Sequence, residues 1–333
     1  MVDSPPMSSI GVAIDGRATL TTIAEQARVA ETGGADTLWV ACHLFLRDPI
    51  TTAHVALAAT TRLKVALMAM SPYATHPVFI AMAAAALAEL YPGRVILCLG
   101  VGAPGDRSAA GIMAPQPLAT LHEAITLCRT LFAGETIRHQ GARFQVTGRR
   151  LAGAPCAIPI VLAASGPRML ELAGAEADGV LLSSAASVPF VRQCLDTVAR
   201  GATGRTLWRC GIVYTCMASQ GSAALTHLRR ALGFILRGAH HARNLQLAGT
   251  QLDQQYLYNA YAQEDWPTVE RLITDDLMQR HAAIGTAEHV LARFAEYRAA
   301  GLDQVIIGGV DNAAGLADAL HAVQTLVHNG AHP

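Results

Sequence analysis

Two side chains with acid–base chemistry, His43 and Asp15, each follow a short apolar run of the sequence. An imidazole exchanges a proton near neutral pH and can bind a ligand ring, and a carboxylate can carry a proton or anchor a polar group. Each also has a structural explanation, because a lone histidine is as often structural as functional and Asp15 could cap a helix that begins near residue 20. Both are candidate catalytic residues, and the structural alternatives stay open.

A glycine-rich segment, GVGAPGD, runs from Gly100 to Asp106. Because glycine has no Cβ, the backbone at Gly100 and Gly102 can approach a planar ring or a phosphate closely. Asp106 is either the N-cap of a following helix or a contact to a cofactor or substrate. The segment is therefore a candidate binding loop, although such turns also occur without a ligand.

A second candidate binding segment is Ala164-Ser165-Gly166, which continues into Pro167 and Arg168. Proline is a favourable first residue of a helix, so the free backbone N–H groups at this helix start could hold a phosphate, and Arg168 could add positive charge. An ordinary turn with a serine cap explains the same residues. Ser184, at the end of the apolar run LLSSA, is one more candidate.

Short apolar runs alternate with longer amphipathic stretches, a pattern that predicts parallel strands joined by helices. Eight runs predict strands at residues 10–14, 37–41, 63–68, 95–99, 159–163, 179–182, 209–215 and 304–308. Apolar residues at three- and four-residue spacing predict helices that include residues 20–32, 77–90, 118–131, 167–175, 189–199 and 287–300. This order predicts an α/β protein with a closed (β/α)8 (TIM) barrel, in which 1–333 form one domain.

All of the candidate residues fall at the C-terminal ends of predicted strands or in the segments that follow them, where such barrels place their catalytic groups. Two stretches of the sequence do not belong to the strands and helices of a minimal barrel. Residues 134–154 suggest a hairpin-like or loop excursion, and the polar stretch 223–280 suggests a helical insertion, either a bundle over the barrel mouth or an interface between subunits. The insertion contains His240 and His241, but adjacent side chains on a helix diverge and no third ligand is evident, so no metal site is expected.

The composition excludes several functional classes. The formal net charge is +0 and basic residues form no dense cluster, so nucleic acid is not an expected partner. No apolar stretch reaches about 18 residues and the start lacks a cationic signal-peptide segment, so we expect a cytoplasmic protein with no membrane association. The seven cysteines show no CxxC spacing and are expected to be reduced. Lys64, the only lysine, is predicted to begin a strand, which argues against a Schiff-base aldolase.

Four ordered segments carry a family resemblance: SPYATHPVFIAMAAAALAELYPGRVILCLGVGAPGD, LHEAITLCRTLFAGE, PIVLAASGPRMLELAGAEADGVLLSS and AAIGTAEHVLARFAEYRAAGLDQVIIGG. They resemble the luciferase-like flavin and deazaflavin oxidoreductases, and most closely the methylenetetrahydromethanopterin reductase branch of that family. The resemblance covers nearly the whole chain. The shared order and spacing of the four segments make it more specific than any one of them.

The resemblance implies a cofactor, coenzyme F420 or FMN, whose tricyclic ring lies across the barrel mouth with its edge near His43. Residues 164–168 would hold its phosphate. Members of the family carry a non-prolyl cis peptide at the end of the third strand, and the matching bond here is Met68–Ala69, with Ser71 shortly after it. The expected partners are a small-molecule substrate and further copies of the chain, as a dimer or tetramer.

Two departures from the family pattern concern proton transfer. The methanopterin reductases carry an acid inside the first strand, where this chain has Ala13, and an Asp-His pair after the second strand, where it has Cys42 and His43. Asp15 lies two residues beyond Ala13 and is expected on the same side of the strand. It is therefore the expected substitute for the missing acid.

The preferred interpretation is a reductase or dehydrogenase that moves a hydride between the cofactor and a one-carbon tetrahydropterin, of the methanopterin or folate type, or a similar small molecule. An FMN-dependent monooxygenase is the close alternative, because reduced FMN supports oxygen insertion whereas a deazaflavin reacts poorly with oxygen. A second alternative is a non-catalytic flavin-binding protein, which the departures at Ala13 and Cys42 favour.

Overall fold

A closed ring of eight parallel strands forms the centre of the computed structural model, which describes residues 9–310 and 312–329. The strands are β1 (Ser9–Ile14), β2 (Thr37–Ala41), β3 (Lys64–Met70), β4 (Val95–Leu99), β7 (Ile160–Ala164), β8 (Gly179–Leu182), β9 (Trp208–Met217) and β11 (Gln304–Gly308). Each strand pairs with the next in this order, and the pairing of β11 with β1 closes the ring. The predicted (β/α)8 barrel is confirmed, with small shifts at some strand ends, and Lys64 begins a strand as expected.

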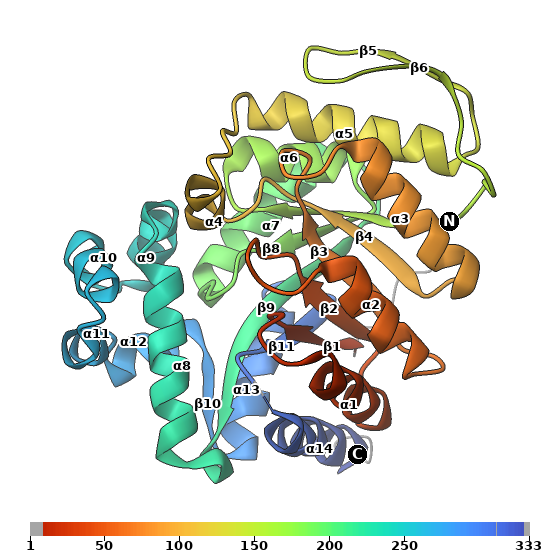
Figure 1. The fold of residues 1–333 in the computed structure, drawn as a ribbon. Helices are drawn as coiled ribbons and strands as arrows, with labels where there is room; N and C mark the ends of the chain where they lie inside the picture. Colours follow the sequence, from red (N-terminus) through yellow and green to blue (C-terminus); the bar gives the residue numbers. More distant parts are fainter. Residues whose placement is uncertain (1–8, 311, 330–333) are drawn as a thin grey trace.

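Helices surround this ring (Figure 1). They are α1 (Leu20–Thr32), α2 (Pro49–Ala58), α3 (Pro77–Leu90), α4 (Pro104–Ala109), α5 (Pro117–Phe132), α6 (Pro167–Glu176), α7 (Val188–Ala202), α13 (Ala287–Ala299) and α14 (Ala313–Asn329). Proline occupies the first turn of α2 through α7. Its fixed φ suits a helix there, and no hydrogen bond of the helix is lost, because first-turn N–H groups have no partner within the helix. The predicted helices all form. None of the described helices is long and apolar enough to cross a membrane.

Side chains at alternate strand positions fill the inside of the barrel, because successive residues of a strand point to opposite faces. The indole rings of Trp39 and Trp208 lie 5.5 Å apart, centre to centre, among buried aliphatic side chains. The Trp39 Nε1–H donates to Thr37 Oγ1 at 2.9 Å and to Gln304 Oε1 at 3.0 Å. The barrel interior is therefore packed, and a ligand has to bind at an open end of it.

Both predicted excursions exist. Strands β5 (Ile137–Gln140) and β6 (Gln145–Arg149) form an antiparallel hairpin that projects from the barrel. The stretch between β9 and the short strand β10 (Ala283–Gly285) is helical and has its own hydrophobic core. Its helices are α8 (Gly221–Leu236), α9 (Ala242–Ala248), α10 (Gln254–Ala262), α11 (Trp266–Leu272) and α12 (Asp275–His281). Because β10 pairs with the end of β9, the helical segment starts and ends at neighbouring strands.

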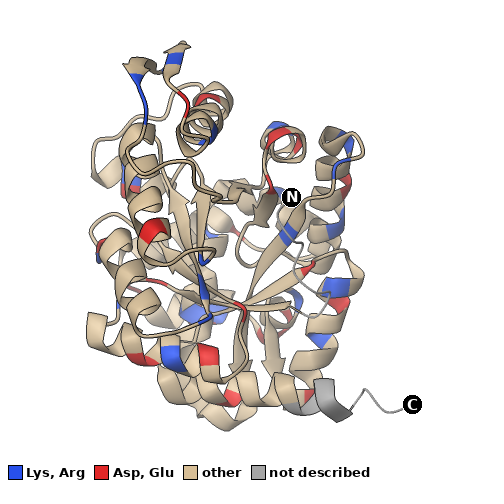
Figure 2. Ribbon diagram, turned by 90° about the vertical axis from the view of Figure 1, so that its right-hand side faces the viewer, with Lys and Arg blue, Asp and Glu red and all other residues tan. Residues whose placement is uncertain are grey.

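Basic and acidic residues are intermixed over the ribbon (Figure 2). Many of them are paired, such as Arg209 with Asp303 and Arg129 with Asp178. In this view the blue and red ribbon segments are dispersed among tan ones, and the formal net charge is +0.

Candidate active site

A cavity of about 1400 Å³ lies at the C-terminal ends of the barrel strands. Its walls come from segments that follow β2, β3, β4, β7 and β8, together with the start of α5. The predicted site residues that line it are His43, Met68, Ala69, Gly100, Gly102, Ala164, Ser165, Gly166, Arg168 and Ser184. Asp15, Ser71 and Asp106 are absent from the described residues that line it.

The floor of the cavity consists of small residues at the ends of β3, β4 and β7. The Met68–Ala69 peptide is cis, as expected, and the register between β3 and β4 shifts beside it. A Cβ added to Gly100 would lie 2.9 Å from the Ala69 Cβ and 3.3 Å from the Ala163 Cβ. Only glycine fits at position 100, and these residues leave a shallow apolar surface on which a planar ring can lie.

The start of α6, on another wall of the cavity, offers backbone donors that could hold an anion. Gly166 is the N-cap residue and α6 has no side-chain capping hydrogen bond, so the alternative of a serine-capped turn is wrong. The first N–H groups of a helix have no partner inside the helix, and the helix dipole favours a negative charge there. No heavy atom lies within 4 Å of a Cβ added to Gly166, and Arg168 lines the same cavity. A phosphate group fits this position.

His43 on the cavity wall is held by Asp106. The Nδ1 atom of His43 lies 3.1 Å from Oδ2 of Asp106, and both side chains are partly exposed, at 39% and 25%. A carboxylate at Nδ1 favours the tautomer that carries its proton on Nδ1, which leaves Nε2 as the ring atom available to a ligand. The N-cap interpretation of Asp106 is wrong, because the N-cap of α4 is Ala103 and Asp106 lies in the first turn.

Cys42, next to His43, lines the same wall. Burial raises the pKa of its thiol to about 11, and the nearby carboxylates of Asp48 and Asp106 contribute. The side chain is therefore a neutral thiol at physiological pH. It does not replace the acid that the family pattern has at this position.

Asp15 is exposed at the end of β1, away from the cavity lining. Its carboxylate pairs with Arg17 Nε at 2.9 Å and accepts the Arg17 backbone N–H at 2.8 Å. The cap of α1 is Thr19, so Asp15 does not cap that helix either. The expected alignment of Asp15 with Ala13 fails because β1 ends at Ile14, and strand alternation no longer applies beyond it.

Ser71 shapes the loop next to the cavity instead of lining it. The side chain is buried, and its Oγ donates to the Val101 carbonyl at 2.8 Å and accepts the Tyr73 N–H at 3.3 Å. These bonds tie the end of β3 to the segment after β4. Ser71 thus supports the position of Gly102, whose added Cβ would lie 3.4 Å from the Ser71 side chain.

The helical segment contributes His240 to the cavity lining, which the sequence did not predict. Asn244 fixes the segment against the β8–α7 loop, because its Oδ1 accepts the Ser187 N–H and its Nδ2 donates to the Ala185 carbonyl, both at 2.8 Å. The His240 and His241 rings do not diverge as expected but lie 4.3 Å apart. Burial lowers the pKa of His240. The described residues contain no group of three side chains that could hold a metal ion.

Further lining residues escaped the sequence analysis because loops and helix faces bring them in from several elements. They are Arg107, Gln116, His122, Met169, Leu172 and Ile212. The only sequence signal for them was closeness to a predicted strand end or helix start. His122 on α5 pairs through Nδ1 with Glu176 on α6 at 2.7 Å.

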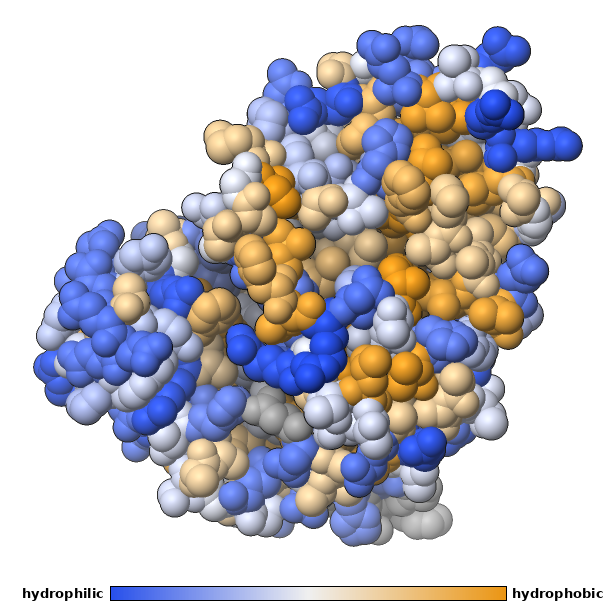
Figure 3. All heavy atoms as spheres, viewed as in Figure 1, coloured by the Kyte–Doolittle hydropathy of each residue, from blue (hydrophilic) through white to orange (hydrophobic). Residues whose placement is uncertain are grey.

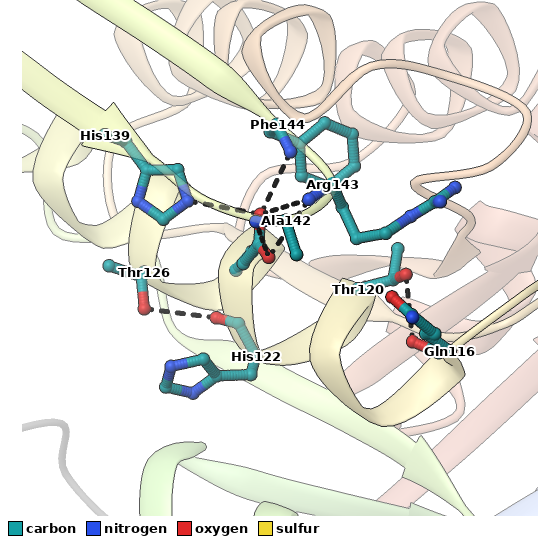
Figure 4. Close-up of polar contacts among 9 residues, drawn as sticks. Gln116, Thr120, His122, Thr126, His139, Ala142, Arg143 and Phe144 are labelled. Atoms are coloured by element: carbon teal, nitrogen blue, oxygen red, sulfur yellow. Dashed lines mark hydrogen bonds and ion pairs between the residues drawn. The ribbon is translucent and has the colours of Figure 1, made fainter.

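The next residue on α5, Glu123, anchors the β5–β6 hairpin. Figure 4 shows its hairpin partners His139, Ala142, Arg143 and Phe144 gathered beside α5. Its buried carboxylate accepts backbone N–H groups of Ala142 and Phe144 at 2.9 Å and of Arg143 at 3.1 Å, and contacts His139 Nε2 at 3.2 Å. Burial raises the pKa of Glu123, but these hydrogen bonds outweigh it and lower the pKa below its usual value. The hairpin is therefore fixed to the helix whose first turns form part of the cavity wall.

The sequence matches one protein family and a group of reductases. A family model described as luciferase-like monooxygenase matches residues 5–304. Over 295 residues the chain is 30% identical to 5,10-methylenetetrahydromethanopterin reductase of Methanolobus tindarius, which covers 86% of this chain and 89% of that protein.

Two solved structures share the fold. The coenzyme F420-dependent tetrahydromethanopterin reductase of Methanopyrus kandleri superposes with a TM-score of 0.86 at 21% identity, over 96% of this chain and 99% of that one. The oxygenating constituent of 3,6-diketocamphane monooxygenase from Pseudomonas putida, in complex with FMN, gives 0.73 at 16% identity, over 95% and 96% of the two chains. The same barrel thus occurs in an F420-dependent reductase and in an FMN-bound monooxygenase.

Proposed function

The chain belongs to the luciferase-like monooxygenase family, and from that premise we propose that it is an oxidoreductase that transfers a hydride between F420 or FMN and a small organic substrate. One observation carries the proposal: His43, held by Asp106, lies on the wall of a cavity whose floor includes Ala69, Gly100 and Ala163. This arrangement combines a surface for a planar ring with a group that can exchange a proton.

The residues present fit a phosphate-bearing flavin or deazaflavin. The space beside Gly100 would be filled by any larger side chain, and the start of α6 offers backbone donors and Arg168 to a phosphate. When bound, the cofactor supplies the ring carbon or nitrogen that accepts or donates the hydride. We assign Ala164, Ser165, Gly166 and Arg168 to the phosphate.

The remaining roles belong to side chains of the loops after β2 and β4. In this proposal His43 contacts the ring edge or the substrate through Nε2 and carries the proton that accompanies hydride transfer. Asp106 holds the Nδ1 proton and so fixes the orientation of the imidazole. The neutral thiol of Cys42 adds apolar surface beside it. Asp106 thereby provides, from the first turn of α4, the carboxylate that the family pattern has next to the histidine.

We propose a one-carbon tetrahydropterin of the methanopterin or folate type as the substrate class. The 30% identity to a methylenetetrahydromethanopterin reductase over most of both chains supports it. An FMN-dependent monooxygenase is the second candidate, which the shared fold with an FMN-bound oxygenating protein favours. The His43–Asp106 pair supports turnover over the non-catalytic flavin-binding alternative.

The decisive experiment is titration of the purified protein with F420 and with FMN, together with the absorbance spectrum and mass of any molecule that copurifies. The loaded protein is then mixed with methylenetetrahydromethanopterin or methylenetetrahydrofolate, and oxidation of the reduced cofactor is followed spectrally with and without oxygen. Oxygen-independent turnover supports the reductase, and oxygen-dependent turnover supports the monooxygenase. Binding of neither cofactor would remove the proposal.

We also propose that the protein is cytoplasmic, forms a single domain and acts as a homo-oligomer. All seven cysteines are free, which suits a reducing compartment.

The oligomer proposal rests on an exposed apolar face. Apolar side chains cover the outer side of the molecule near α2 and α3 (Figure 3), and three of them on α3 are exposed: Phe79, Met82 and Leu90. Such a face is typical of a subunit contact. Sedimentation velocity of the protein and of a Phe79→Ser, Leu90→Ser variant tests this.

A further inference from the structure

Phe45 has a backbone conformation and an exposure that the fold does not explain. It lies in a turn in which the Leu46 N–H donates to the His43 carbonyl at 3.3 Å. Its φ is +67°, and its side chain is among the large hydrophobic side chains exposed to solvent, at 74%. Phe45 is therefore both in the left-handed region and uncovered.

Both properties cost free energy at this position. A left-handed φ at the third residue of a turn favours glycine or asparagine, because a Cβ there crowds the backbone, and a bulky side chain is a rare outlier. An exposed phenyl ring gains nothing from burial. A glycine at position 45 would satisfy the turn better. A contact that the protein makes only when a ligand is bound explains the presence of a phenyl ring at position 45.

The ligand in the cavity is the candidate for this contact: Phe45 is not itself among the described residues that line the cavity, but it lies in the loop that does. Phe45 is two residues from His43, which lines the cavity and is tied to Asp106. Two of the other described non-glycine residues with a left-handed φ are Gln116, which also lines the cavity, and Ala185, which follows the lining residue Ser184. Backbone strain of this kind gathers at binding sites.

A second exposed apolar side chain occupies a loop on the same cavity. Met113 is 81% exposed and directly precedes Ala114, which lines the cavity. Its loop follows α4, which carries Asp106, so the His43–Asp106 contact connects the loops of Phe45 and Met113. Phenyl rings stack on planar ring systems, and a thioether packs well against their edges.

We infer that Phe45 is a substrate-specificity residue, which packs on a planar, ring-bearing substrate after the cofactor is bound, with Met113 as a second apolar contact. The inference rests on the proposed function and adds the shape of the substrate to it. The phenyl ring contacts the substrate and not the cofactor phosphate, which has its own groups at the start of α6.

The test uses variants that separate the ring from the backbone. Phe45→Gly and Phe45→Asn remove the ring and suit the left-handed turn, whereas Phe45→Tyr keeps the ring. Phe79→Ala, on the outer face of α3, removes a phenylalanine of comparable exposure (64% against 74%) that lies on another element. Its oligomeric state is measured as well, because Phe79 belongs to the proposed subunit contact. Cofactor affinity, thermal midpoint and binding of substrate probes to the cofactor-loaded protein are measured for each. The probes are tetrahydromethanopterin and tetrahydrofolate as planar compounds, and glucose 6-phosphate and 2-propanol as compounds without a planar ring.

We expect at least one planar probe to bind the wild type, and Phe45→Gly and Phe45→Asn to weaken that binding by roughly 3- to 10-fold, the range of an aromatic contact. Their thermal midpoints should equal or exceed that of the wild type, and Phe45→Tyr and Phe79→Ala should bind the probe as the wild type does. The inference is overturned if only non-planar probes bind, if no probe binds, or if Phe45→Gly binds the planar probe normally. Failure of the proposed function would show itself separately, as loss of cofactor binding in the wild type.

Discussion

The Nδ1 atom of His43 lies 3.1 Å from Oδ2 of Asp106, although the two residues are 63 positions apart in the sequence. This contact joins the loop after β2 to the helix after β4 at the mouth of the barrel. It fixes the imidazole on the cavity wall and determines which ring nitrogen is available to a ligand. Proton exchange in the proposed reaction depends on this pair.

Replacement of His43 by alanine should lower turnover by roughly 10²-fold while cofactor affinity changes less, because a proton-transferring group acts mainly in the transition state. Asp106→Asn should lower turnover less, on the order of 10-fold, and change the pH dependence of the rate, because the amide no longer stabilises a protonated imidazole. Steady-state rates over pH 5 to about 9 measure both effects. Asp15→Asn is the control outside the cavity. A normal rate and pH profile for both His43→Ala and Asp106→Asn would show that the active groups lie elsewhere on the wall.

The floor of the cavity gives a second prediction. Gly100→Val should abolish or strongly weaken cofactor binding and destabilise the protein by about 1–3 kcal/mol, because its Cβ would lie 2.9 Å from the Ala69 Cβ. Gly105→Ala is the matched control, since no heavy atom lies within 4 Å of a Cβ added there. Isothermal titration and thermal unfolding measure the two effects. Unchanged cofactor affinity in a folded Gly100→Val protein would show that the ring binds away from this floor.

The start of α6 gives a third prediction. Gly166→Leu should fold normally, because no heavy atom lies within 4 Å of an added Cβ, and it should weaken cofactor binding because its side chain would occupy the proposed phosphate site. Arg168→Ala should weaken binding on the order of 10-fold and reduce its dependence on salt, since a charged contact to phosphate is lost. Titrations at low and high ionic strength check both. Equal salt dependence in wild type and Arg168→Ala would place the phosphate elsewhere.

The sequence predicted the strands and helices of the barrel because their periodicity is a local property. It also placed the ends of β2, β3, β4 and β7 at the site, since the C-terminal ends of barrel strands share one face. It could not pair His43 with Asp106, because that contact depends on how the loop after β2 and the helix α4 meet in space. Asp15 was misplaced for a related reason. Asp15 lies beyond Ile14, the last residue of β1, where it pairs with Arg17 instead of facing the cavity lining. His240 reaches the cavity from the helical segment, whose position against the β8–α7 loop depends on long-range contacts such as those of Asn244.

Glu123 gives a fourth prediction. Glu123→Gln should destabilise the β5–β6 hairpin by about 1–3 kcal/mol, because an amide NH2 cannot accept the backbone N–H bonds that the carboxylate accepts. Hydrogen exchange at residues 142–144 should become faster, while exposed Glu89→Gln serves as the control. Because the pKa of Glu123 is lowered in the folded protein, its contribution to stability is present above about pH 4.5 and is lost below it. Unchanged exchange in the variant would mean that other contacts hold the hairpin.

The last prediction concerns the stability of the helical segment at mildly acidic pH. His281 is buried on α12, where its Nδ1 contacts the Ala185 carbonyl at 2.9 Å and its Nε2 contacts Thr250 Oγ1 at 3.0 Å. Burial lowers the pKa of His281 to about 4, and burial together with the nearby His240 and His281 lowers that of His241 to about 3. In the unfolded chain both titrate near about 6.5. Between these values the unfolded state binds protons that the folded state does not. The free energy of unfolding is therefore highest above about pH 6.5 and falls as the pH falls, by at most about 1.4 kcal/mol per pH unit for each histidine.

This pH dependence is tested by removing one of the two histidines. His281→Gln should roughly halve the slope of the free energy of unfolding against pH between about 6.5 and 4, as measured by urea unfolding. Thr250→Val removes a hydrogen-bond partner but no titratable group, so it should lower stability at every pH and keep the wild-type slope. A wild-type stability that stays constant from pH 7 to about 5 would show that these histidines are protonated in the folded protein.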